Sequence, residues 1–431
     1  MIINILSKHE LYMTKIITFS SLSLLTSLLS TTTFATTGYF LHGYGVKAQG
    51  NAGTSIANFQ DALTIAKNPA GLSWITPRID IGATIFSPDR SAHIEGNQTP
   101  FGSADGQYDG NGRSYFVIPE VAYNHRVNDT VNLGIALYGN GGMNTGYKKN
   151  PYAVFGNTGT AGVDLTQAFI SPAIAWKYSD KQSIAVATNI LYQQFEAKGI
   201  SGFGAFSSDG DHLSDRGKDS STGIGLRVGW AAKLFEDKLT LGANYSSKID
   251  ADRFDRYRGL FAEQGDFDVP ESYGIGIAYQ FTPKLNIAVD AERINYSDVA
   301  SVGRPIGVLF QGHTFGTEDG PGFGWDDINV YKIGATYQAT PKLTLRAGYS
   351  YNDQPIPSDQ TFLNILAPGV VQSHLSLGAT WNLDEHQELS LAYTHALEKD
   401  VEGEIPAALG GERAQLTMNQ NILGLAYGYK F

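Results

Sequence analysis

Five basic residues stand among small and polar neighbours in segments that alternate between apolar and polar side chains: Lys177, Arg227, Lys233, Lys332 and Arg346. If these segments are strands, the five side chains lie on the polar faces. A cation enclosed by protein can bind a carboxylate through charge-assisted hydrogen bonds. We therefore expect Lys332, Arg227 and Arg346 to be the candidates for binding a carboxylate ligand.

The same polar faces also carry the acids Glu120, Asp290 and Glu292. Ion pairs between these acids and the basic residues would stabilise the fold and leave no cation free for a ligand. The sequence leaves both interpretations open.

Enzyme chemistry has little support in the sequence. Four histidines in predicted strands or turns stand beside no recognisable nucleophile motif and lack metal-ligand spacing: His125, His374, His386 and His395. The chain has no cysteine, so thiol chemistry and disulfides are excluded. We expect no catalytic residue, no metal and no cofactor, and we keep an esterase as one alternative.

The composition excludes two further classes of protein. The 431 residues include 49 Gly, 23 Tyr and 22 Phe, and the net charge is −11. Nucleic-acid binding would need a basic patch, which this acidic balance does not favour. A helical membrane protein would need runs of about 20 apolar residues, and no such run follows residue 35.

Residues 1–35 are typical of a removable export signal. Lys15 precedes an apolar and serine-rich stretch over residues 16–29, and a Thr-Phe-Ala tripeptide ends at Ala35. We expect cleavage after Ala35, with Met13 as an alternative start codon and a transmembrane anchor as the alternative structure.

From residue 77 to 431, segments of about ten residues alternate with period two. Tyr273, Ile275 and Ile277 share one face of such a segment, and Gly274 and Gly276 share the other. The apolar faces carry Tyr, Trp and Phe near the segment ends, where amphipathic rings prefer the lipid headgroups. This pattern predicts an all-β fold, a transmembrane antiparallel β-barrel.

The pattern predicts about fourteen strands: 78–87, 115–125, 131–139, 166–178, 183–195, 222–234, 239–248, 272–281, 285–296, 329–338, 343–352, 373–383, 388–397 and 420–431. Short connections alternate with seven long ones of about twenty residues or more. Short turns of such barrels face the periplasm and long loops face outside, so both ends of the barrel chain are expected on the periplasmic side.

Residues 36–76 do not fit the strand pattern. They begin glycine-rich and then predict a short helix from about Asp61 to Lys67, which the Asn68-Pro69 pair ends because a residue before proline avoids helical geometry. A barrel of about fourteen strands is wider than one filled by its own side chains. We therefore expect this segment to plug the lumen as a hatch.

Several motifs resemble the FadL/TodX family of outer-membrane transporters. They are the stretch from Gly38 to Gly50, Asp61-Ala62, the hatch motif Asn68-Pro69-Ala70 with Gly71-Leu72, Tyr138 to Thr145, Tyr351 to Pro357 and the terminal Phe431. The resemblance runs from the hatch to the final strand. It implies a fourteen-stranded barrel with a hatch and passive uptake of hydrophobic compounds, without nucleotide or metal.

The resemblance also implies a kink in the third strand that opens a side exit toward the bilayer. Gly139, Gly141 and Gly142 suit such a kink, because glycine marks bulges and tight bends. Apolar clusters in the long loops include Leu309, Phe310, Phe362 and Leu363. Exposed apolar patches mark interaction sites, so these loops are predicted to capture the ligand, or alternatively to pack together as a cap.

The sequence thus predicts a monomeric outer-membrane channel of a Gram-negative cell for hydrophobic molecules, with long-chain fatty acids or hydrocarbons as substrates. Lipid, lipopolysaccharide and the barrel-assembly machinery are the expected partners. A general porin, a surface adhesin and an outer-membrane esterase are the alternatives. A porin should lack a hatch, and an adhesin would rely on its loops alone.

Overall fold

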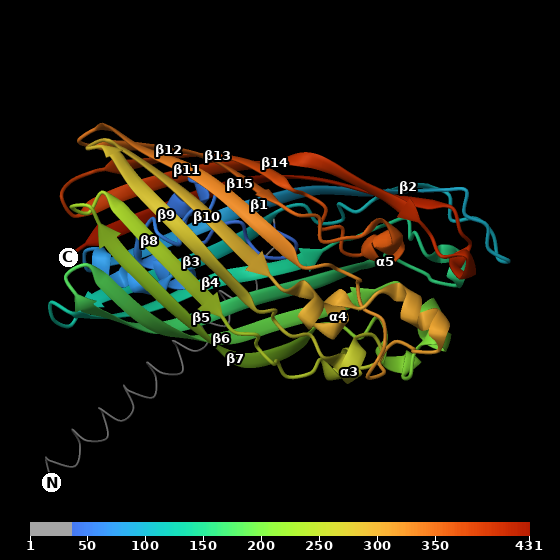
Figure 1. Cartoon of the computed structure of the whole chain (residues 1–431). Helices are drawn as coiled ribbons and strands as arrows, with labels where there is room; N and C mark the ends of the chain where they lie inside the picture. The colour runs from blue at the N-terminus through green and yellow to red at the C-terminus, as the bar shows by residue number, and fades with distance from the viewer. Residues whose placement is uncertain (1–36) are drawn as a thin grey trace, which may run out of the picture.

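The computed structural model describes residues 37–431, so the predicted signal lies outside the described residues. Within that range fourteen strands close into an antiparallel barrel, in which each strand pairs with its sequence neighbour and β15 pairs with β1 (Figure 1). The strands are β1 (Arg78–Glu95), β3 (Phe116–Arg126), β4 (Val131–Asn144), β5 (Gly162–Ser179), β6 (Gln182–Lys198), β7 (Asp219–Leu234), β8 (Leu239–Ser246), β9 (Ser272–Thr282), β10 (Leu285–Ile294), β11 (Ile328–Thr340), β12 (Leu343–Asn352), β13 (Ser373–Asn382), β14 (Gln387–Glu404) and β15 (Arg413–Lys430). The predicted barrel of fourteen strands is confirmed.

The two faces of each strand differ as the alternation predicts. On β9, Ile275 and Ile277 point outward and are 64% and 50% exposed. Gly274 and Gly276 point inward, where a Cβ atom on Gly276 would come within 2.8 Å of Ile56. Exposed apolar side chains on the outer face cost free energy in water and are stabilised in lipid. None of the helices in residues 37–431 is long and apolar enough to cross a membrane.

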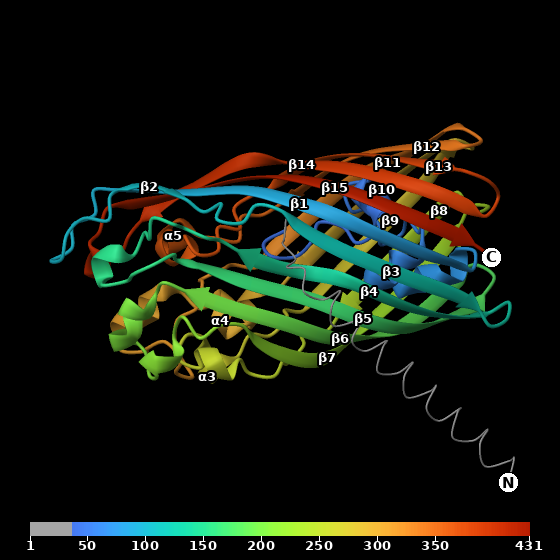
Figure 2. The same ribbon diagram turned by 180° about the vertical axis from the view of Figure 1, so that it is seen from behind.

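Short turns and long connections lie at opposite ends of the barrel. The C-terminus lies at the end with the short turns, and the small helices lie at the other (Figures 1 and 2). In the connections at that end these are α3 (Ala262–Gly265), α4 (Ala300–Gly303), α5 (Thr361–Asn364) and the 3-10 helices Ala153–Phe155, Ser201–Phe206, Gly210–His212, Asp255–Tyr257, Tyr296–Asp298, Ile306–Gln311, Ser358–Gln360 and Ala407–Leu409. The segment before β1 contains α2 (Val46–Gln49) and the 3-10 helices Ala62–Ala66 and Pro69–Trp74.

Several strands are longer than the sequence predicts, three of them much longer, and one strand was not predicted. β1 continues past residue 87, β14 continues past residue 397, and β15 begins before residue 420, and these extensions form a ribbon. β2 (Gly106–Asp109) joins this ribbon by pairing with β1. The first strand was expected to end at residue 87, yet the next residue, Pro88, pairs with Gln420. On the other edge of β1, pairing with β3 ends at Phe86 and pairing with β2 begins at Ser91. Pro88 lies between these two residues, where no neighbouring strand requires the backbone N–H that proline lacks.

This extension corrects the predicted loop lengths. The connection between β14 and β15 covers only residues 405–412, whereas a long loop was expected. The ribbon is stabilised on its inner face by buried side chains such as Ile94 and Leu416. The pattern failed there because these residues pack against loops rather than against a membrane or a lumen.

Candidate functional site: the buried N-terminal segment and a side gap

Residues 37–76 lie inside the barrel, toward the end that carries the C-terminus (Figure 1). Carboxylates of the barrel wall accept hydrogen bonds from the backbone of this segment, which we call the plug. Glu120 accepts from the N–H groups of Gly45 and Val46 at 3.2 and 3.0 Å. Across the lumen, Asp290 accepts from Ser55 and Ile56 at 2.8 and 3.0 Å. Backbone donors and wall acids thus fix the plug from opposite sides.

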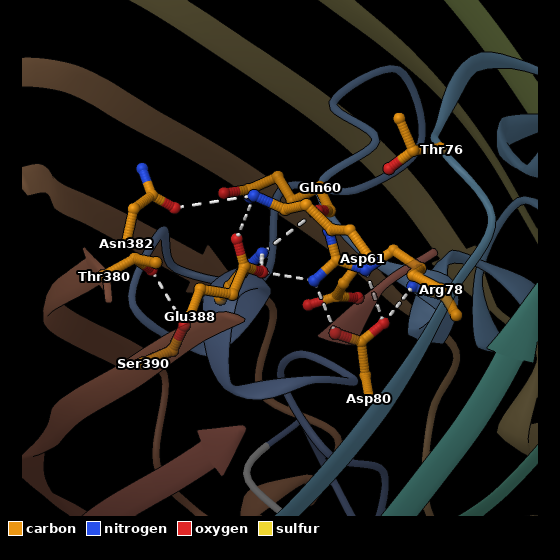
Figure 3. A network of polar contacts seen from close by, with 12 residues as sticks. Gln60, Asp61, Thr76, Arg78, Asp80, Thr380, Asn382, Glu388 and Ser390 are labelled. Carbon is orange, nitrogen blue, oxygen red and sulfur yellow. Dashed lines mark hydrogen bonds and ion pairs between the residues drawn. The ribbon is translucent and has the colours of Figure 1, made fainter. Parts of the chain in front are cut away.

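A buried ionic network holds the plug near the short-turn end (Figure 3). Glu388 on β14 forms ion pairs with Lys47 of the plug and with Arg78 of β1. Its second oxygen pairs with Lys430 at 2.9 Å. Asp80 binds Arg78 at 2.6 Å and accepts from the N–H of Ala62 at 2.9 Å. Because every charge has an opposite partner, the network can exist without water around it.

The predicted hatch motif has a capping role in the plug. The Asn68 side chain accepts from the N–H of Ala70 and so caps the 3-10 helix Pro69–Trp74. Its amide donates to the carbonyl of Ile56 at 2.7 Å and to that of Trp230, on β7, at 3.0 Å. One side chain therefore joins the cap, the plug and the wall. The preceding short helix is a 3-10 helix, Ala62–Ala66, capped by Asp61.

Strands β3 and β4 pair only over the halves that lie nearer the short-turn end of the barrel. Their register runs from Arg126 opposite Asn132 to Val121 opposite Leu137. Between this paired region and the loop end of the barrel, residues 116–120 and 138–144 do not pair with each other, and we call this region the side gap. At its loop end the gap is closed by two hydrogen bonds: the Gly112 N–H donates to the Gly146 carbonyl at 3.0 Å, and the Gly146 N–H donates to the Gly110 carbonyl at 2.9 Å. Pro119, which cannot donate, stands on the β3 edge of the gap.

The start of the plug covers the side gap from within. The N–H of Leu41 donates to the carbonyl of Asn140 at 3.1 Å, and Gly142 donates to Tyr39 at 2.9 Å. A Cβ atom on Gly141 would lie 1.9 Å from the backbone carbonyl oxygen of Tyr39, so glycine fits this close contact without a clash. The register between β4 and β5 also shifts between Gly139 and Gly141. The predicted kink glycines thus lie at a β-bulge, and Gly141 touches the plug.

Aromatic rings hold the first residues of the plug. The Tyr296 hydroxyl donates to the Thr37 carbonyl at 2.6 Å and accepts from the Tyr39 N–H at 3.2 Å. The Tyr39 ring lies 5.1 Å from that of Tyr296 and 6.0 Å from those of Phe267 and Trp325. The upper end of the plug is therefore held by rings and backbone rather than by charge.

Two small cavities flank this upper end. One, of about 30 Å³, lies between β1 and the end of β4 and is lined mainly by apolar residues, with Phe86, Met143, Trp325 and Met418 among them and Arg90 at its polar side. The other, of about 10 Å³, is lined by Phe40, Tyr44, Lys67, Asn140 and Arg227 among others. Both cavities contact residues of the plug or of the side gap.

The predicted carboxylate-binding residues all contact the plug or a partner in the wall. Lys332 pairs with Glu292 at 2.8 Å, and Lys67 of the plug pairs with the same acid. Arg346 donates to Gln60 at 2.5 Å. Arg227 donates to the Tyr138 hydroxyl at 2.8 Å. Lys332 is therefore paired with an acid of the barrel wall, which is the alternative interpretation that the sequence left open.

Sequence reasoning missed Arg90, because the predicted strand stopped at residue 87. Pro88 in a Ser-Pro-Asp-Arg run is typical of a turn. The burial alternation of β1, continued by two more steps past Phe86, would have placed Arg90 on the inner face.

The predicted capture loops are only partly exposed. Phe362 and Leu309 are buried, Leu363 is half-buried and Phe310 is 43% exposed. Phe310 lines a groove of about 590 Å³ at the loop end, together with Ile306 and Ile405. Most of the apolar loop residues therefore pack as a cap, while Phe310 faces a groove.

The fold and the occupied lumen define a class, the plugged membrane β-barrels. The chain belongs to the outer membrane protein transport family described by OMPP1, FadL and TodX, whose model matches residues 26–431. The protein therefore resides in the outer membrane, and its family transports hydrophobic compounds.

Three relatives show the range of the family. A Neisseria meningitidis serogroup B protein named as an outer membrane protein is 26% identical, covering 94% of this chain and 98% of its own. The long-chain fatty acid transport protein of Escherichia coli O6:H1 is 24% identical, covering 92% and 95%. The crystal structure of the Pseudomonas putida toluene transporter TodX matches with a TM-score of 0.68 at 20% identity, covering 92% and 100%.

Proposed function

We propose that this protein takes up hydrophobic small molecules passively, with long-chain fatty acids as its substrates, and releases them sideways into the bilayer. The observation that carries the proposal is the side gap between β3 and β4, which lies next to a mainly apolar cavity while the plug fills the lumen below. A straight route through the lumen would have to displace the plug and its ion pairs. A sideways route has to move only the start of the plug, which covers the side gap, and leaves the ion pairs in place.

The driving force on this route is burial of the ligand chain. Transfer of each CH₂ group from water to an apolar environment gains about 0.8 kcal/mol. An apolar path from the loop groove to the lipid is favourable for a long chain and offers nothing to a sugar. In this proposal Phe310 belongs to the first contact surface, and the chain acts as a channel rather than an enzyme.

Aromatic hydrocarbons are the second candidate substrates, because a named relative transports toluene. Both candidates use the same route, and they differ in whether the ligand carries a charge. Adhesion through the loops is compatible with either.

Uptake measurements in a strain that lacks its own copy of the gene test the proposal. Cells expressing the protein should accumulate labelled oleate faster than cells with an empty vector, and labelled glucose at the same rate. Toluene uptake in the same cells separates the second candidate. Equal accumulation of all three compounds with and without the protein would overturn the proposed transport.

The same cells test the export signal. N-terminal sequencing of the outer-membrane protein should give Thr36 as the first residue. Retention of residues 1–35 would contradict the proposed cleavage after Ala35.

A further inference from the structure

Arg90 is a buried cation that lacks an ionic partner. Its side chain points inward from β1, and the residue is 1% exposed. No carboxylate in residues 37–431 forms an ion pair with it. The buried cations Lys332, Lys67 and Lys47 differ in this respect, because each has an acid at contact distance. Arg227 and Arg346 also form no ion pair among the described residues, but of these three arginines it is Arg90 that lines the mainly apolar cavity beside the side gap. An isolated buried charge is costly, so an unpaired one calls for an explanation.

The hydrogen bonds of Arg90 hold it in place without neutralising it. One terminal nitrogen donates to the Asn144 carbonyl at 2.5 Å and the other to the Arg113 carbonyl at 2.6 Å. The remaining hydrogen bonds, to the side-chain oxygens of Asn111 and Asn144, measure 3.4 to 3.5 Å, and the guanidinium carbon lies 5.9 Å from the centroid of the Phe116 ring. All of these acceptors are neutral. The guanidinium is thus fixed at the loop end of the side gap, and apart from its two short hydrogen bonds its N–H groups make only long ones.

The surroundings of Arg90 suit the head group of an amphiphile. The cavity of about 30 Å³ that Arg90 lines holds roughly two waters, which is the size of a carboxylate rather than of a whole ligand. The rest of its lining is largely apolar, with Phe86, Met143 and Met418 among its residues. Charge and apolar surface therefore meet at one place beside the side gap.

We propose that Arg90 is the residue that binds the carboxylate of the transported molecule, which makes the substrates anionic amphiphiles rather than neutral hydrocarbons. This rests on the proposed uptake function. The head group replaces the long contacts of the guanidinium with charge-assisted hydrogen bonds. The cavity holds only the head group, so the chain extends out of it through the side gap toward the lipid. Lys332 and Arg346 keep their roles in holding the plug.

A matched pair of substrates tests the assignment: labelled oleic acid and labelled oleyl alcohol, which share the chain and differ in charge. In Arg90→Gln the ratio of acid to alcohol uptake should fall about tenfold or more, because a charge-assisted hydrogen bond is lost. Arg90→Lys should recover part of the ratio. Arg256→Gln, which changes an exposed loop arginine that donates to the Arg216 carbonyl, should leave the ratio unchanged.

The alternative is that Arg90 only ties β1 to the end of β4. Uptake of acid and alcohol would then fall together in Arg90→Gln, and this outcome would overturn the assignment while leaving the proposed function intact. Failure of the unaltered protein to import either compound would instead overturn the proposed function.

A measurement on the unaltered, folded protein covers the case in which Arg90→Gln does not fold. Trp325 lines the same cavity, so a dibrominated stearic acid should quench its fluorescence. The quenching is assigned by the difference from Trp325→Phe. The dibrominated alcohol should quench at least tenfold more weakly at equal concentration. Equal quenching by both, or none from Trp325, would contradict the proposal.

Discussion

The two ends of the plug are held by different forces. Near the short-turn end, Lys47 contacts Glu388 in a network with Arg78 and Asp80 that has little access to water. At the other end, Tyr39 lies among aromatic rings and pairs with the edge of β4 through its backbone. One end depends on charge, and the other depends on apolar contact.

This difference indicates which end of the plug stays in place. Separating buried opposite charges leaves unpaired ions and costs several kcal/mol, so the charged end resists displacement. Apolar contacts can be exchanged for similar contacts with an apolar ligand at little net cost. The same segment can therefore seal the lumen below and yield to a ligand beside the side gap.

The largest effect is expected from removing the plug altogether. Deletion of residues 38–71 should make the barrel permeable to small hydrophilic solutes, because a barrel of this width is not filled by its own side chains. Entry of a chromogenic β-lactam into intact cells measures this leak. Correctly folded deletion variants that stayed impermeable would show that the plug does not seal the lumen.

Breaking the charged end should have the next largest effect. Glu388→Gln leaves Lys47, Arg78 and Lys430 without their shared anion, at a cost of about 3–5 kcal/mol in unfolding free energy. Denaturant unfolding of the purified barrel measures it. The control is Asp237→Asn, which removes an exposed ion pair with Lys181 and should cost at most about 1 kcal/mol. Equal effects of both variants would refute the special role of the network.

The sequence predicts the charged end less well than the strands around it. Alternation in β9 gives the facing of Ile275 and Ile277 directly, because the membrane and the lumen impose opposite chemistry on successive residues. The inward position of Glu388 follows from the same rule. Its partner Lys47 does not, because the plug has no periodic pattern and its path depends on contacts distant in sequence.

The side gap and Arg90 show a second limit of the sequence. The glycines of β4 mark a place for a bulge, and Pro119 marks an edge, but neither indicates how far β3 and β4 pair. That extent depends on the start of the plug, which supplies the hydrogen bonds that β3 does not. Arg90 escaped prediction because the predicted strand stops at residue 87, although the alternation of β1 continues past Pro88 through Arg90 into the loop region.

A smaller effect is expected from crowding the apolar end. The Cβ atom of Gly141→Ala would lie 1.9 Å from the Tyr39 oxygen, so the plug must move away from β4. We expect a cost of about 1–3 kcal/mol, as for other overpacked sites. Hydrogen exchange should increase at residues 39–42 and stay unchanged at residues 61–66.

Removal of one hydroxyl group tests the aromatic cluster more gently. Tyr296→Phe deletes the hydrogen bonds with Thr37 and Tyr39 and should cost about 1 kcal/mol. Protease cleavage near residue 39 should become faster while the lower plug stays protected. Tyr349→Phe, which loses one exposed bond to Ser373, is the control. Equal cleavage rates in the two variants would show that the hydroxyl does not hold the plug.

The smallest effect is a pH dependence at the apolar end. Asp266 lies in the loop beside Phe267, whose ring contacts Tyr39, and its carbonyl accepts from Ser301 at 2.5 Å. Burial, together with the neighbouring Asp268, raises the pKa of Asp266 to about 7. Because this pKa lies above that of the unfolded chain, the folded loop binds the proton more tightly.

The loop is therefore most stable when Asp266 is protonated, and that stability is lost as the pH rises from about 4 to about 7. Lys248 pairs with Asp268 at 2.7 Å and moderates the repulsion without removing it. Hydrogen exchange at residues 262–269, corrected for its intrinsic pH dependence, should be faster at pH 8 than at pH 5, whereas residues 184–188 of β6, which carry no titratable side chain, should not change. Asp266→Asn should abolish the difference between the two pH values. A difference of unchanged size in Asp266→Asn would contradict the assigned role of this carboxyl group.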